Sequence, residues 1–132
     1  MWYPKTIHGE KKIGRNITIN IKRDKNFNVG EIWYGIFPLE EDDEQFLPRP
    51  IIILSIEAYE ILAVKVTKQK PKDNFDIPIE NWLYAGLDVP SYARISKYKF
   101  IPKRQFNYKL GNLHFDDLFN IEEKFKEYIS YV

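Results

Sequence analysis

The sequence predicts a small, mainly β domain: a strongly bent sheet or barrel that one C-terminal helix closes. Three observations lead to this fold class. The chain has 132 residues, the size of a single domain. Several short runs rich in β-branched and aromatic residues are separated by turn signals, and only the last stretch repeats apolar residues at helical spacing. We expect residues 30–132 to form this domain and residues 1–29 to be an N-terminal extension packed on it.

The predicted strands are short, as a small bent sheet requires. They cover the ranges 17–21, 31–37, 50–56, 60–67, 75–79 and 91–101. A polar, acidic loop is expected over 39–48. Pro78 indicates that the strand at 75–79 lies at a sheet edge, because proline cannot donate to a neighbouring strand. In the last strand, strict alternation places four side chains on one face: Tyr92, Arg94, Ser96 and Tyr98.

The closing helix is predicted over roughly His114–Ser130. Its apolar positions recur three or four residues apart, as on one helix face: Leu118, Ile121, Phe125 and Tyr128 or Ile129. Asp116 and Asp117 fall in the first turn, where the helix dipole favours carboxylates. His114 stands at the expected start, a position that favours capping over proton transfer.

The composition excludes several classes of protein. Twenty basic against nineteen acidic residues give a net charge of +1, so nucleic-acid binding would have to depend on local segregation of charge. The absence of cysteine excludes disulfides, thiolate zinc sites and cysteine nucleophiles. The longest apolar run is Ile51–Leu54, so we expect no signal peptide, no membrane span and a cytoplasmic protein.

Charge is segregated into two basic stretches and one acidic loop. One stretch holds six cations and no acid: Arg94, Lys97, Lys99, Lys103, Arg104 and Lys109. The other holds Lys65, Lys68, Lys70 and Lys72. Interleaved rings can stack on single-stranded bases, but a solvated face above core rings explains the same pattern. The five consecutive acids Glu40–Glu44 point in diverging directions, which favours a solvated loop over a cation site.

An ordered set of short segments resembles the PemK/MazF family of toxins. Gly30-Glu31-Ile32-Trp33 resembles the first strand of that family, and Glu44-Gln45 followed by Arg49-Pro50 resembles its second. Val66-Thr67 is similar to the pair that ends the next core strand. Ser91–Ser96 resembles the segment that carries an active-site arginine in some members. Lys109-Leu110-Gly111-Asn112-Leu113 resembles the approach to the closing helix, so the resemblance spans about residues 30–130.

The resemblance implies an SH3-like barrel that forms a homodimer through barrel edges and the closing helix. It implies sequence-specific cleavage of single-stranded RNA by attack of a 2′-OH, with no metal and no cofactor. It also implies a cognate antitoxin, and DNA binding together with that antitoxin. Carried over position by position, Arg49, Thr67 and Arg94 match residues used for catalysis. Arginine forks suit a phosphate that gains charge during the reaction.

Two positions depart from the family pattern. Ser96 stands where an acidic residue is usual, and Asp43 where some members have histidine. Serine is a poor base at neutral pH, so we consider Glu44 or Asp43 as well as Ser96 for proton transfer. The residues expected to contact RNA are Lys65, Lys68, Lys97, Lys99, Tyr92 and Tyr98.

Two other functions remain open on the same barrel. The first is a non-catalytic module that binds nucleic acid or a protein target such as gyrase, as the similarly folded CcdB toxins do. The second is a regulatory homologue that kept the fold and lost activity. The replacement of an acid by Ser96 favours the first of these two, the non-catalytic module.

Overall fold

The computed structural model describes residues 10–13, 17–20, 25–38 and 46–131. The elements are β1 (Glu10–Ile13), β2 (Ile17–Asn20), β3 (Glu31–Pro38), β4 (Phe46–Ile56), β5 (Glu60–Thr67), β6 (Asp76–Pro78), β7 (Tyr92–Pro102), the 3₁₀-helix η1 (Lys103–Gln105), β8 (Phe106–Asn112) and α1 (Phe115–Ile129). The predicted class, mainly β with a C-terminal helix, is confirmed. In the described part of the chain, no helix is both long enough and apolar enough to cross a membrane.

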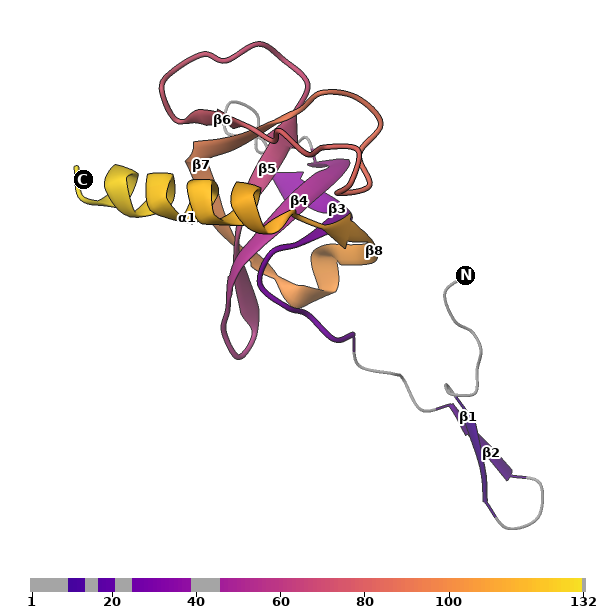
Figure 1. Ribbon diagram of the computed structural model, residues 1–132. Helices are drawn as coiled ribbons and strands as arrows, with labels where there is room; N and C mark the ends of the chain where they lie inside the picture. The colour runs from indigo at the N-terminus through magenta and orange to yellow at the C-terminus, as the bar shows by residue number, and fades with distance from the viewer. Residues whose placement is uncertain (1–9, 14–16, 21–24, 39–45, 132) are drawn as a thin grey trace.

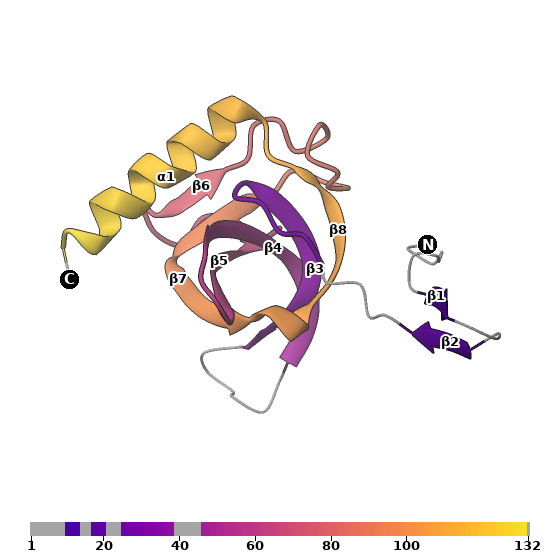
Figure 2. The same cartoon turned by 90° about the horizontal axis from the view of Figure 1, so that it is seen from below.

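Six strands form one antiparallel sheet in the order β6-β7-β5-β4-β3-β8. The sheet curls into a barrel, and α1 lies along its outer side next to β6 (Figures 1 and 2). β6 is an edge strand, as Pro78 predicted. β1 and β2 pair with each other in a separate two-stranded sheet. The packing of the whole extension on the domain stays a prediction, although Phe27 contacts the barrel.

The barrel interior is filled by what we call the inner core. It consists of Trp33, Phe37, Ile51, Ile53, Ile61, Ala63, Ile101 and Phe106. These side chains alternate along β3, β4 and β5 because successive strand residues point to opposite faces. Phe27 adds a ring from outside the strands: its centroid lies 4.7 Å from that of Trp33 and 5.5 Å from that of Phe106.

A second, outer core lies between the sheet and α1. The other face of the same strands supplies residues such as Ile52 and Val64, and Ile121 of the helix is fully buried against them. The helix begins as predicted: the Nδ1 atom of His114 accepts a hydrogen bond from the backbone N–H of Asp116 at 3.1 Å. Both faces of the central strands are therefore covered, which fixes their positions at the end of the barrel described below.

A buried carboxylate fastens the start of β3 to β8. Glu31 accepts hydrogen bonds from the Trp33 ring N–H at 2.8 Å and from Asn28, and it pairs with Lys109 at 3.1 Å. Burial by itself raises the pKa of Glu31. These donors outweigh burial and hold its pKa below the ordinary value, so the group is a carboxylate at neutral pH.

Three details differ from the sequence-based expectations. The strand predicted to start at residue 50 begins at Phe46, because the early part of β4 pairs with β3 alone and tolerates Pro48 and Pro50 there. β8 was not predicted. The strict alternation expected for β7 is wrong after Arg94, since the register shifts between its pairing with Lys65 and the next pairing of the ladder.

Candidate functional site

At one end of the barrel, the inner face changes from apolar to charged. The register aligns Ile51 of β4 with Lys65 of β5, Lys65 with Arg94 of β7, and Arg94 with Asp76 of β6. Residues paired across an antiparallel sheet share one face. The row of side chains that begins in the inner core therefore ends in three ionisable groups, all of them buried in the structure.

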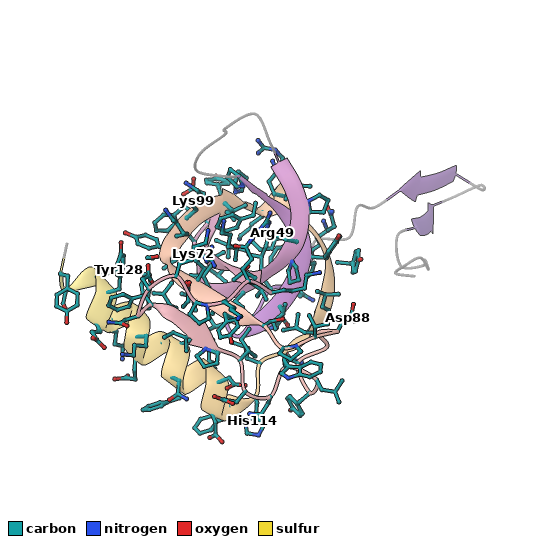
Figure 3. The ribbon with its side chains drawn as sticks, turned by 90° about the horizontal axis from the view of Figure 1, so that it is seen from above. Arg49, Lys72, Asp88, Lys99, His114 and Tyr128 are labelled. Atoms are coloured by element: carbon teal, nitrogen blue, oxygen red, sulfur yellow. The ribbon has the colours of Figure 1, made fainter. Side chains whose placement is uncertain are left out.

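Arg49 and Thr67 lie one step further along the same face. Each is two residues beyond the Ile51–Lys65 pair, in opposite chain directions, so antiparallel geometry places them next to each other. They border a hollow of about 570 Å³. Its lining consists of Tyr34, Pro48, Arg49, Pro50, Val66, Thr67, Lys68, Gln69, Leu87, Asp88, Val89 and Ser91. Figure 3 looks toward this end of the barrel, with Arg49 near the middle of the opening and Asp88 in the loop beside it.

Arg94 is held by a buried acid that the sequence analysis missed. Its Nε atom lies 3.2 Å from Oδ1 of Asp76, and the side chains are 8% and 1% exposed. The N–H at Nε is not directed at this oxygen, so the contact is Coulombic and not an aligned hydrogen bond. The other carboxylate oxygen accepts the backbone N–H of Lys72 at 2.7 Å. The signal available in the sequence was an acid on the predicted edge strand, within reach of the strand that carries Arg94.

Arg49 lies close to this pair, and its surroundings disfavour the positive charge of its guanidinium group. Burial lowers the pKa of Arg49, and the positive charge of Arg94 lowers it further. Arg49 Nε and Arg94 Nη2 are both buried, and neither finds a hydrogen-bond acceptor among the described residues. A buried donor without a partner is costly, and an anion placed between the two guanidinium groups would relieve both penalties.

Thr67 lines the hollow, and a backbone contact determines how its hydroxyl group can form hydrogen bonds. Its Oγ1 accepts a hydrogen bond from the backbone N–H of Gln69 at 3.1 Å. The hydroxyl proton can then be donated to a group in the hollow. The lining of the hollow thus offers the fork of Arg49 and one neutral donor, with the buried fork of Arg94 nearby, which is a set suited to holding a phosphate group.

The structure brings some of the other predicted residues to this end of the barrel. Lys68 lines the hollow, and Tyr92 is the strand partner of Thr67. Lys65 is buried, with its ammonium 5.9 Å from the centre of the Phe37 ring. Its position between Ile51 and Arg94 places it next to the site, but it is not part of the lining of the hollow.

Other predicted residues lie elsewhere. Ser96 is hydrogen-bonded to Asp73 in the loop before β6, with 3.2 Å between Oγ and Oδ2. Lys97 lies within the irregularity of β7 and Lys99 at its end, and Figure 3 shows Lys99 at the barrel rim. Tyr98 packs edge-on against Phe125 of α1, with 5.2 Å between the ring centroids. Its ring is therefore part of the packing around the outer core. Asp43 and Glu44, together with the whole cluster Glu40–Glu44, lie outside the described residues.

Comparison with known proteins adds independent support for the fold. The family model that describes the PemK-like, MazF-like toxins of type II toxin-antitoxin systems matches residues 28–129 of this chain. Among solved structures, the chain is similar to the Mycobacterium tuberculosis toxin MazF-mt6, with a TM-score of 0.61 and 17% sequence identity. The similarity covers 76% of this chain and 96% of that one. No match is found among curated proteins.

The family match covers most of the chain, including every residue of the site described above. It begins at residue 28, so it confirms the resemblance in the segment where the sequence motifs placed it. The chain belongs to the PemK-like, MazF-like toxin family of type II toxin-antitoxin systems.

Proposed function

We propose that this toxin is a metal-independent endoribonuclease that cleaves single-stranded RNA at the hollow beside Arg49. The observation that carries the proposal is the pair of neighbouring guanidinium groups, each with a buried donor that no described residue satisfies. RNA brings its own nucleophile, so the protein needs to orient the strand and stabilise charge. Cations and a hydroxyl donor in one hollow are adapted to those two tasks.

In the proposed reaction, the 2′-OH attacks the adjacent phosphorus. The new O2′–P bond forms as the P–O5′ bond breaks, which leaves a 2′,3′-cyclic phosphate and a free 5′-OH. Arg49 binds the phosphate oxygens as their negative charge grows, and Thr67 donates a hydrogen bond to the same group. Arg94 contributes a second positive charge, and Asp76 keeps its side chain in place.

Proton transfer has three candidate residues. One proton leaves the 2′-OH and one must reach O5′, and serine does neither well at neutral pH. Ser96 is also directed at Asp73. We therefore favour Glu44 or Asp43 for this step.

The proposal is tested by incubating the purified protein with a long single-stranded RNA in excess EDTA. We expect fragments that end in 2′,3′-cyclic phosphate. Arg49→Ala should lower the single-turnover rate about a hundredfold or more, because a donor to developing phosphate charge is worth about 3 kcal/mol. Arg104→Ala is the matched control, since Arg104 is exposed in η1, and it should cleave like the wild type.

Two outcomes would contradict the proposal. An unchanged rate in Arg49→Ala, with unchanged thermal stability, removes Arg49 from the site. RNA binding without cleavage by the wild type supports the non-catalytic module instead. The same readouts therefore separate the enzyme from the binding protein.

A further inference from the structure

On the outer face of the sheet, two tyrosines and a proline lie side by side on neighbouring strands, and this row leads to the hollow. Tyr108 of β8 is the strand partner of Tyr34 of β3, and Tyr34 is the partner of Pro50 of β4. The two tyrosine rings are stacked, with centroids 5.3 Å apart and planes inclined by 30°. Tyr34 is half-buried and lines the hollow, whereas Tyr108 is exposed behind it.

The lining of the hollow contains two chemical kinds of residue. Arg49, Thr67 and Lys68 are polar. The apolar lining, which alternates with them along β4 and β5, consists of rings and aliphatic groups: Tyr34, Pro48, Pro50, Val66, Leu87 and Val89. At about 570 Å³ the space falls within the range of pockets that hold small organic ligands, so it exceeds what a phosphate alone would fill.

We propose that the apolar lining binds one unpaired nucleobase, stacked on Tyr34, of the RNA strand whose phosphate lies at Arg49. This inference rests on the proposed function. A nucleobase has apolar faces that stack on aromatic rings, and its phosphate is a short distance along the same strand. Asp88 stands between Leu87 and Val89 of this lining and repels phosphate, which favours a base there over the backbone.

Tyr108 makes Tyr34 a better platform. A ring that is already stacked on a neighbour loses little conformational freedom when a base arrives. Neither tyrosine is needed to fill the inner core or the outer core. The paired arrangement of a half-buried and an exposed ring is explained by a ligand that stacks.

The inference is tested by fluorescence anisotropy with a labelled, mixed-sequence single-stranded oligonucleotide in which every 2′-OH is methylated, so that no cleavage can occur. Tyr34→Leu, which removes the ring and keeps an apolar side chain, should weaken binding about 5- to 100-fold. Tyr34→Phe should bind like the wild type. Tyr59→Leu is the matched control, because Tyr59 is exposed in the turn between β4 and β5.

A second measurement does not depend on a folded variant. An oligonucleotide carrying 5-iodouridine is cross-linked to the wild-type protein with ultraviolet light, and the modified peptide is identified by mass spectrometry. We expect cross-links at Tyr34 and none at Tyr59. Wild-type binding of Tyr34→Leu, or cross-links that avoid Tyr34, would overturn the inference.

Unmodified RNA is assayed for cleavage in parallel, so that the two proposals can fail separately. A wild type that cleaves RNA, together with a Tyr34→Leu variant that binds normally, rejects the stacking site and leaves the endoribonuclease standing. A wild type that neither binds nor cleaves single-stranded RNA rejects both.

Discussion

At the scale of single residues, the site depends on the buried ion pair between Arg94 and Asp76, of which Asp76 is the more enclosed partner. Asp76 is almost fully enclosed and meets both Arg94 and the backbone N–H of Lys72. It cannot reach a substrate directly, so we regard it as a positioning residue. In this chain an acid on a neighbouring strand accompanies the arginine, while the position two residues after that arginine is Ser96.

Asp76→Asn should destabilise the protein strongly. The amide oxygen can still accept the Lys72 N–H, but Arg94 loses its counter-charge while it remains buried. Removing one partner of a buried pair costs about 3–5 kcal/mol of unfolding free energy. Urea unfolding followed by tryptophan fluorescence measures this loss.

Asp73→Asn is the control, because Asp73 lies three residues earlier, in the loop before β6, and its contacts are exposed. It should change the unfolding free energy by less than about 1 kcal/mol. The double variant Asp76→Asn, Arg94→Gln removes both charges and should recover part of the loss. If Asp76→Asn is as stable as the wild type, the pair does not hold the site together.

At the scale of elements, the sequence predicted what depends on local patterns. The strand at 31–37 was correct because its β-branched and aromatic residues favour strands, and the strand at 60–67 because alternating residues indicate a sheet, in both cases without reference to any partner. β8 was missed because Phe106–Asn112 mixes exposed polar residues with a glycine. Its extended form comes from pairing with β3.

Long-range contacts explain the parts of the site that the sequence could not predict. Arg49, Thr67 and Arg94 were named by resemblance, and the structure brings them to one end of the barrel. Asp76 was not named, because its partner is set by the β6–β7 pairing.

Gly111 lies in one of the segments that carried the family resemblance, and the structure explains why glycine occupies this position. A Cβ there would lie 2.3 Å from the carbonyl oxygen of Ala85.

Helix α1 is fastened to the loop between β6 and β7 by Asp117. This carboxylate is buried and accepts the backbone N–H groups of Glu80 and Asn81 at 3.1 and 2.8 Å. The same loop continues to Leu87 and Asp88 in the wall of the hollow. A residue that the sequence assigned to the helix dipole therefore also joins the helix to the site.

Asp117→Ala should lower the unfolding free energy by about 2–4 kcal/mol, because two part-buried backbone donors lose a charged acceptor. Asp116→Ala is the matched control in the same helical turn, since its carboxylate is 71% exposed and only faces His114 at 3.7 Å. It should cost less than about 1 kcal/mol. Thermal unfolding followed by circular dichroism compares the two variants, and equal losses would contradict the role assigned to Asp117.

At the scale of the whole molecule, the net charge is close to zero, but cationic and apolar side chains lie in different places on the surface. The hollow gathers cations at one end of the barrel. Elsewhere, exposed apolar side chains gather where the loop of residues 80–87 meets the start of α1. They are Leu83, Tyr84, Phe115 and Phe119, and the contact between the Tyr84 and His114 rings joins the two segments at 5.3 Å. We call this group the apolar patch.

We predict that the protein is a homodimer in which the apolar patch is buried. Leu83 is 73% exposed and Phe115 is 75% exposed in the single chain, and contiguous apolar surface of this kind marks an interaction site. Light scattering of the wild type at micromolar concentration should give twice the mass of one chain. The double variant Leu83→Ser, Phe119→Ser should shift the protein toward the monomer while its thermal unfolding stays cooperative. Tyr59→Ser removes an equally exposed ring in the turn between β4 and β5, and should remain dimeric. A wild type that is monomeric at these concentrations would contradict the prediction, and a dimeric double variant would place the interface on another face.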